Sequence, residues 1–120
     1  MSLLMEGDMA VLNYVELPVA SSGASAQFYG NAFGWSFTEY GPDYAAHEAA
    51  PCELGLNGTG GQSSAGILPA IEVEDLEGAR DAVIKAGGKI SQDIFAFPGG
   101  RRFHFTDPDG LELAVYVKES

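Results

Sequence analysis

With 120 residues, 46% of them apolar, the chain is long enough to form one folded domain with a hydrophobic core. Its net charge of -11, with only six Lys and Arg, excludes nucleic acid as a partner, because that affinity comes from neutralising phosphates, and it disfavours an anionic membrane surface. The single cysteine, Cys52, excludes an internal disulfide, and no apolar run reaches the ~20 residues that cross a bilayer, so a cytoplasmic location is expected.

Residues 1–9 contain three methionines and are interpreted as a disordered or vector-derived tail of a single domain over 10–118. In the first half of that domain, 10–58, Ser21 or Ser22 can begin a helix and Gly34 can end it, which predicts a helix over 23–33. Apolar and polar residues alternate in four further stretches that are typical of strands: 10–19, 35–40, 44–49 and 52–57. Cys52 is predicted to be a small buried side chain.

A segment rich in Gly and Ser, 59–66, is interpreted as a linker, after which the same order of elements returns in 67–118. The predicted elements here are a strand (67–73), a helix between Asp75 and Gly87, a strand (89–97) and a hairpin (102–117). Glu16-Leu17 in the first half matches Glu72-Val73 in the second. Each half therefore reads as one strand, one helix and three strands, and an internal duplication is the simplest explanation.

The predicted hairpin has a turn, Asp107-Pro108-Asp109-Gly110, in which proline and glycine suit the backbone angles that a turn requires. In its first strand, Phe103 and Phe105 are expected to pack under a helix, which turns Arg102 and His104 toward the opposite face. In its second strand the aliphatic face is Leu111, Leu113, Val115 and Val117, and the mixed face is Glu112, Ala114 and Tyr116. A mixed face of this kind suits the wall of a cavity.

Four sets of motifs, in this order, resemble the vicinal-oxygen-chelate superfamily, which includes glyoxalase I, bleomycin-resistance proteins, fosfomycin-resistance enzymes and extradiol dioxygenases. The motifs are Val15-Glu16-Leu17-Pro18-Val19, Phe28-Tyr29 with Phe33-Gly34-Trp35, Glu72-Val73-Glu74-Asp75-Leu76 with Gly87-Gly88-Lys89, and Asp107-Pro108-Asp109-Gly110. The resemblance implies an α+β fold of paired βαβββ modules that form a curved mixed sheet around a cup, with one helix outside each module, and usually a homodimer. It does not identify a reaction, because this superfamily hosts many chemistries.

Metal-dependent members of this superfamily hold a divalent ion at four positions on the first and last strands of the two modules. The resemblance places Tyr14, Glu53, Leu68 and Ala114 at these positions. Glu53 is a good ligand and tyrosine is an uncommon one, whereas the side chains of leucine and alanine have no donor atom. We therefore expect no family-type metal site and no cofactor.

Six polar residues are expected to face the cup and to contact a ligand: Tyr14, Glu16, Glu53, Arg102, Glu112 and Tyr116. His104 and Glu53 are the candidates for catalysis, because a histidine beside carboxylates can act as a general base. Three functions stay open. The protein binds a neutral or cationic small organic ligand without a metal, or it is a lyase or isomerase that transfers a proton in the cup, or it sequesters a cationic antibiotic.

Overall fold

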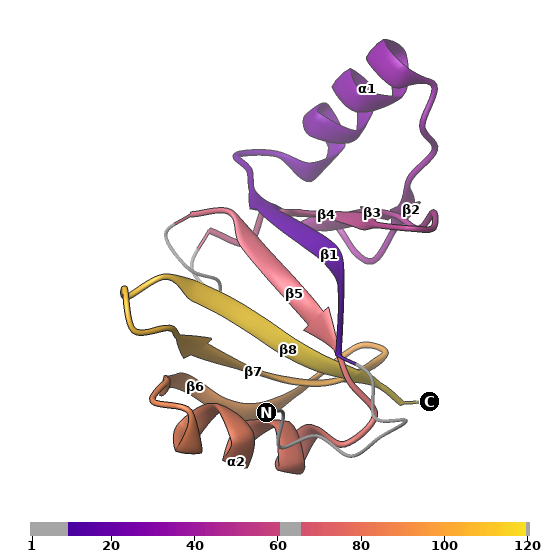
Figure 1. Ribbon diagram of the computed structural model, residues 1–120. Coiled ribbons are helices and arrows are strands. Elements are labelled where there is room, and N and C mark those ends of the chain that lie inside the picture. The colour runs from indigo at the N-terminus through magenta and orange to yellow at the C-terminus, as the bar shows by residue number, and fades with distance from the viewer. Residues whose placement is uncertain (1–9, 61–65, 120) are drawn as a thin grey trace. The chain divides into compact units, whose positions relative to one another are not determined.

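The computed structural model describes residues 10–60 and 66–119 (Figure 1). Within these residues it contains two helices and eight strands, which confirms the mixed α+β architecture. The predicted tail, 1–9, and most of the predicted linker, 59–66, lie outside the described residues. None of the described helices is long and apolar enough to cross a membrane.

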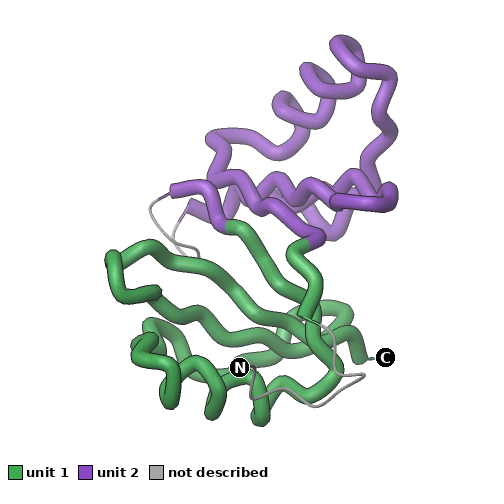
Figure 2. Tube along the Cα trace, in the orientation of Figure 1, with its two compact units in different colours: residues 1–12, 69–120 green, residues 13–68 purple. Residues whose placement is uncertain are grey.

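The chain divides into two compact units (Figure 2). The first runs from Asn13 to Leu68 and is called the N-terminal unit here; the second combines Met1–Leu12 with Pro69–Ser120 and is called the C-terminal unit. Each unit builds its own strands and one helix. The cup expected from the sequence depends on how the two units face each other, and it stays a prediction.

The N-terminal unit has a sheet in the order β2-β3-β4-β1. Its elements, in chain order, are β1 (Val11–Pro18), α1 (Ser22–Phe33), β2 (Thr38–Glu39), β3 (Tyr44–His47) and β4 (Glu53–Asn57). β1 pairs with β4 in parallel, whereas β3 is antiparallel to both β4 and β2. The first strand and the last strand of the unit are therefore neighbours, which brings side chains about 40 residues apart in sequence onto one face.

Helix α1 begins and ends as its sequence predicts. The Ser21 hydroxyl caps the helix by accepting a hydrogen bond from the Ala24 amide at 3.1 Å. At the other end Gly34 adopts φ 74°, and its amide donates to the Gly30 carbonyl at 2.8 Å. The predicted bounds are therefore correct to within one residue.

Two predictions for this unit are wrong. The strand predicted at 35–40 is reduced to the two residues of β2, because Trp35 instead stacks on the ring of His47, with centroids 4.8 Å apart and 11° between the planes. The residues just before β2 are held by this stacking and by a second contact with His47, whose Nδ1 atom lies 2.9 Å from the Ser36 carbonyl oxygen. Cys52 is exposed rather than buried, because β4 begins only at Glu53.

The C-terminal unit has a sheet in the order β5-β8-β7-β6. Its elements are β5 (Leu68–Glu72), α2 (Leu76–Lys85), β6 (Lys89–Phe97), β7 (Gly100–Thr106) and β8 (Glu112–Lys118). β5 and β8 pair in parallel, and β7 is antiparallel to both of its neighbours. The carboxylate of Asp75 caps α2 by accepting from the Gly78 amide at 3.0 Å, as its sequence position predicts.

The predicted hairpin is present, and β7 starts two residues earlier than predicted, at Gly100. Gly110 adopts φ 83° in the turn, and its amide donates to the Asp107 carbonyl at 2.9 Å. Leu111 lies outside β8 and is 63% exposed, so its predicted place on the aliphatic face is wrong. The turn uses its amide instead, which donates to the Asp107 carboxylate at 3.0 Å.

Helix α2 packs against β6, β7 and β8 and covers the hydrophobic core of its unit (Figure 1). The buried members of this core are Val73, Leu76, Ala79, Phe103 and Val115. Phe105 and Val117 pack against them. Because residues alternate along a strand, the neighbours of these side chains, Arg102, His104 and Tyr116, project from the face opposite α2.

Candidate functional site

A first cluster of polar side chains lies on one face of the N-terminal sheet. Tyr14 and Glu16 are two residues apart on β1 and therefore point the same way. Their register partners on β4 are Glu53 and Gly55, so Glu53 shares this face. Tyr44 enters the same face from β3, since it is aligned with the β4 residue two positions beyond Gly55.

This face is the one turned away from the end of helix α1. His47 is three residues after Tyr44 on β3 and so projects from the other side, where Trp35, two residues beyond the end of α1, stacks on it. The stack of Trp35 on His47 thus lies on one face of the sheet, and the polar cluster, which includes Tyr14 and Tyr44, occupies the other.

Hydrogen bonds organise the cluster around a buried carboxylate. Glu16 is 2% exposed, and it accepts from the Tyr44 hydroxyl at 3.0 Å and from the Asn57 amide group at 3.3 Å. The hydroxyls of Tyr14 and Tyr44 are 2.6 Å apart. Asn57 is itself fixed, because its carbonyl oxygen accepts from the amide and the hydroxyl of Thr59, at 2.9 Å and 2.7 Å. Burial, followed by the neighbouring Tyr14 and Glu16, raises the pKa of Tyr44 above its ordinary value.

Gly55 makes this arrangement possible. A Cβ atom at this position would lie 2.2 Å from the Tyr44 hydroxyl oxygen and 2.4 Å from that of Tyr14. Both distances are far inside van der Waals contact, so the two hydroxyls meet directly above the backbone of residue 55. Any side chain here would separate them.

A second cluster lies in the C-terminal unit, on the face opposite α2. Nδ1 of His104 is 3.1 Å from Oε2 of Glu112, and the Ser91 hydroxyl donates to the same oxygen at 2.9 Å. His104 has no exposed surface, and its ring lies 5.7 Å from that of Phe95. The predicted orientation of His104, opposite the helix-facing Phe103, is therefore confirmed by the core contacts.

Arg102 lies beside this cluster on an aromatic support. Its guanidinium carbon is 5.2 Å from the ring centroid of Phe95 and 5.7 Å from that of Phe97, within the range of cation–π contact. Its register partner on β8 is Tyr116. Two of the predicted ligand contacts are thus adjacent on the sheet.

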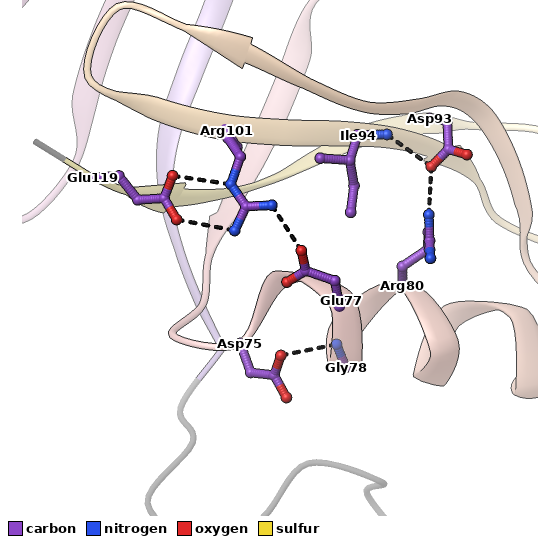
Figure 3. A network of polar contacts seen from close by, with 8 residues as sticks. All are labelled: Asp75, Glu77, Gly78, Arg80, Asp93, Ile94, Arg101 and Glu119. Carbon is purple, nitrogen blue, oxygen red and sulfur yellow. Dashed lines mark hydrogen bonds and ion pairs between the residues drawn. The ribbon is translucent and has the colours of Figure 1, made fainter.

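The preceding arginine has a structural role instead (Figure 3). Arg101 binds Glu119 through two hydrogen bonds of 2.9 Å and Glu77 through one of 2.7 Å, which ties β7 to the end of β8 and to α2. These hydrogen bonds lower the pKa of both carboxyl groups, Glu77 and Glu119, and raise that of Arg101. A similar pair on the surface joins Arg80 to Asp93 at 2.7 Å.

The structure thus separates the predicted site residues into two groups. Tyr14, Glu16 and Glu53 share a face of the N-terminal unit, and Arg102, His104, Glu112 and Tyr116 share a face of the C-terminal unit. Sequence reasoning missed Tyr44, Asn57 and Gly55. Alternation along β3 and β4 could have placed Tyr44 and Asn57 on the polar face, but the stretch at 44–49 was too weak a strand to give a register. Gly55 had no signal, because a glycine in a strand does not reveal what lies above it.

The comparison with family models decides the family. The model described as "Glyoxalase/Bleomycin resistance protein/Dioxygenase superfamily" matches residues 11–115. The chain belongs to this superfamily. Among curated protein sequences, none matches the chain.

Several solved structures resemble this chain at low sequence identity, and this likeness shows the fold alone. A structure described as an NAD-dependent benzaldehyde dehydrogenase from Legionella pneumophila has TM-score 0.76 and 20% identity, covering 89% of this chain and 99% of that one. Methylmalonyl-CoA epimerase from Mycobacterium tuberculosis has TM-score 0.75 and 12% identity, covering 98% and 94%. The Mn(II)-bound glyoxalase from Novosphingobium aromaticivorans has TM-score 0.65 and 22% identity, covering 91% of this chain and 40% of that one.

The residues at the superfamily's metal-ligand positions do not fit a divalent ion. Tyr14 and Glu53, which the resemblance places at two of these positions, are register partners on β1 and β4. In the C-terminal unit the register pairs Ala114 with Ala70, and Leu68 lies two residues earlier on β5. Neither alanine has a donor atom, and among residues 10–60 and 66–119 no group of three or more His, Cys, Asp or Glu side chains is placed to hold a metal.

Proposed function

We propose that this superfamily member binds a small organic ligand, neutral or cationic, without the divalent ion that metal-dependent members use. The observation that carries the proposal is the register pair Ala70 and Ala114, because the resemblance expects a carboxylate ligand at residue 114 and neither alanine has a donor atom. Buried polar side chains, such as Glu16 and His104, lie on the sheet faces turned away from the helices and support a ligand-binding role. Such sites hold a few placed polar groups on an apolar floor.

The test is ligand-dependent stabilisation in the presence of a chelator. We expect purified protein to contain no stoichiometric metal, and Mn²⁺, Zn²⁺ and Ni²⁺ to leave its melting temperature unchanged in titrations. A ligand from a library of small amines, amides and carbonyl compounds should stabilise the protein with EDTA present, by about 2.7 kcal/mol at a hundred times its Kd. Micromolar binding of a divalent ion that Glu53→Gln removes would refute the metal-free part of the proposal.

A second function, proton-transfer catalysis as a lyase or isomerase, is favoured by the contact between His104 and Glu112. An ionised glutamate only accepts hydrogen bonds, so Nδ1 of His104 donates the proton at 3.1 Å and, in the neutral ring, Nε2 is the basic nitrogen. A base held in one tautomer suits the removal of a proton from carbon beside a carbonyl group. Glu53, in the other unit, is the alternative base.

Deuterium incorporation from D₂O into a panel of carbonyl compounds, followed by NMR, separates enzyme from binder. For an enzyme, His104→Ala should abolish exchange, whereas Glu112→Gln should lower the rate and shift its pH dependence because the tautomer is no longer fixed. The variant Ser91→Ala keeps the His104–Glu112 contact and is the matched control. If the protein is a binder, ligands will stabilise it with no exchange in any variant.

We also propose that the chain forms a homodimer through the aromatic surface of α1. Residues 17–38 contain no charged side chain, although the whole chain carries a net charge of -11. Within this segment Phe28 and Phe33 are 62% and 60% exposed. Two copies of so acidic a chain repel each other except where their surfaces are neutral, so a second copy is the partner that this surface fits.

Sedimentation equilibrium tests the dimer. Phe33→Ser should weaken association, whereas Ile84→Ser, which changes an equally apolar side chain that is 52% exposed on α2, should not. Equal dissociation in both variants, or a monomeric wild-type chain at micromolar concentration, would contradict the proposal.

A further inference from the structure

The chain contains one Asn-Gly sequence, Asn57-Gly58, at the point where β4 ends. Asparagine is most prone to deamidation before glycine, because no side chain hinders attack of the glycine nitrogen on the asparagine side chain. Packing favours glycine here, since a Cβ atom at residue 58 would lie 3.2 Å from the Ser22 amide nitrogen and 3.3 Å from the Asp43 carbonyl oxygen. The packing that leaves no room for a side chain therefore also creates a chemically reactive bond.

The peptide group between these two residues is held at both ends in the folded unit. Its carbonyl oxygen, which belongs to Asn57, accepts from the Val19 amide at 2.9 Å. Its N–H, which belongs to Gly58, donates to the Asp43 carbonyl at 2.7 Å. The nitrogen must lose its proton and turn toward the side chain before it can attack, and these two hydrogen bonds oppose both changes.

The side chain of Asn57 is held as well. It is 6% exposed, and its Nδ2 donates to Oε2 of Glu16 at 3.3 Å. Its Oδ1 accepts from the amide and the hydroxyl of Thr59, at 2.9 Å and 2.7 Å. Ring closure brings the carbon of this side-chain amide to the backbone nitrogen of Gly58, so these contacts have to break first. Reaction consequently requires local opening of this part of the N-terminal unit.

Once the segment is open, the reaction needs only water. The Gly58 nitrogen forms a bond to Cγ of Asn57, the bond from Cγ to Nδ2 breaks, and ammonia leaves with the proton that the nitrogen carried. Water then opens the five-membered succinimide ring at either of its two carbonyl groups. One opening gives aspartate at residue 57, and the other gives isoaspartate, which adds one carbon to the main chain.

Both products conflict with the contacts that hold Asn57. An aspartate places a carboxylate oxygen where Nδ2 donated, at the 3.3 Å contact with Glu16, and two buried carboxylates repel each other. An isoaspartate lengthens the main chain of β4 at the residue that pairs with Tyr44 and accepts from Val19. The unit therefore closes less readily after the reaction than before it.

We propose that Asn57 is a site of gated deamidation. The folded N-terminal unit protects the bond between Asn57 and Gly58, local opening exposes it, and the new carboxylate beside Glu16 destabilises the closed state. Deamidation is thus an irreversible consequence of opening. This proposal is independent of the ligand-binding function, because it needs no ligand and no other chain.

The first test compares the deamidation rate of the folded chain with that of the same chain unfolded in urea, at one pH and temperature. The reaction is followed by mass spectrometry of the fragment 54–72, which a protease specific for glutamate releases. We expect deamidation to be about a hundredfold or more slower in the folded chain, because only the small open fraction reacts.

The hydrogen bond from the Thr59 hydroxyl provides a variant that changes the gate and not the chemistry. Thr59→Ala removes one donor to the Asn57 side chain, so it should speed the folded-state reaction severalfold to roughly tenfold and leave the rate in urea unchanged. Thr38→Ala removes an exposed threonine side chain from β2 of the same unit. This variant is the matched control and should change neither rate.

A charge exchange tests the effect of the product. Asn57→Asp should lower the urea midpoint of unfolding, followed by the fluorescence of Trp35 in the same unit. Adding Glu16→Gln places an amide opposite the new carboxylate, so it should raise the midpoint of Asn57→Asp by more than it changes that of the wild type. If Asn57→Asp alone does not fold, folding of the double variant gives the same answer.

The opposite results would overturn the proposal. Equal rates in the folded and unfolded chain, or equal acceleration by Thr59→Ala and Thr38→Ala, would exclude a gate at these contacts. Absence of deamidation in urea would exclude a reactive bond. If Asn57→Asp is as stable as the wild type, or if Glu16→Gln has the same effect in both backgrounds, repulsion from Glu16 is not the consequence of the reaction.

Discussion

Substitution of Gly55 by alanine is the most direct test of the cluster in the N-terminal unit. The added methyl carbon would lie 2.2 Å from the Tyr44 hydroxyl oxygen and 2.4 Å from that of Tyr14. Each hydroxyl would have to withdraw by about 1 Å or more to reach van der Waals contact. Such a shift breaks the 3.0 Å hydrogen bond from Tyr44 to Glu16 and leaves a buried carboxylate short of a donor.

The magnitude follows from these losses. Overpacking costs about 1–3 kcal/mol, and a lost hydrogen bond to a charged group costs about 1.5–3 kcal/mol. Removing a glycine from a strand returns roughly 0.5–1 kcal/mol. We therefore expect Gly55→Ala to lower the free energy of unfolding by about 2–4 kcal/mol.

The assay is urea unfolding followed by the fluorescence of Trp35, the only tryptophan of the chain, which reports on the N-terminal unit. Gly23→Ala is the control, because the nearest atom to its new methyl group is 4.0 Å away and the change should be neutral or slightly stabilising. In a Tyr44→Phe background the cost of Gly55→Ala should be smaller, since the worst clash and one hydrogen bond are already gone. A cost below about 0.5 kcal/mol, or an equal cost in both backgrounds, would refute the packing argument.

Three further predictions concern the pH dependence of stability and one helix cap. Arg101 lowers the pKa of Glu77 and Glu119 in the folded chain, so these carboxylates stabilise it at pH values above their unfolded pKa of 4.5 and cease to do so as the pH falls; Arg101→Gln should make acid unfolding shallower, measured as the melting temperature between pH 3 and 7. The raised pKa of Tyr44 acts in the opposite direction: the stabilisation it gives the folded chain is complete below the unfolded pKa of 10.0 and is lost as the pH rises further. Because Tyr44 keeps its proton in the folded chain, Tyr44→Phe should leave unchanged the rise in tyrosinate absorbance that precedes alkaline unfolding. Asp75→Ala removes the cap of α2 and should cost about 1 kcal/mol in urea unfolding, whereas Asp75→Ser should cost less.

Local chemistry made several elements predictable from the sequence. Ser21 and Asp75 both cap helices through their own side chains, and Gly110 takes the positive φ that its turn needs. The two faces of β7 followed from alternation, because Phe103 is apolar and His104 is polar on a strand that must bury one side. These features depend on residues close together in the chain.

Pairing between distant strands could not be predicted with the same accuracy. The sequence did not show, for example, that Ala114 on β8 pairs with Ala70 on β5. A shift of two residues keeps a side chain on the same face, so alternation alone cannot detect it. Tyr44 was missed for a similar reason, since its role depends on contacts 28 and 30 residues away, with Glu16 and Tyr14.

The two halves also exchange large and small residues at matched positions. Glu16 faces Gly55 across β1 and β4, and its counterpart Glu72 faces Tyr116 across β5 and β8. In the N-terminal unit the space over the central glycine is filled from the flanking strands by Tyr14 and Tyr44.

In the C-terminal unit the central residue is the tyrosine, and the residues that match those flanking positions by register are Ala70 and Gly100. An aromatic hydroxyl therefore belongs to this region of the sheet in both halves, although a different strand supplies it. Because the hydroxyl-bearing ring changes strand between the halves, identities at single positions understate the relation between them. The same reasoning explains why Tyr116→Gly would not recreate the N-terminal arrangement: Ala70 and Gly100 cannot fill the space, and the cavity would cost about 3–5 kcal/mol.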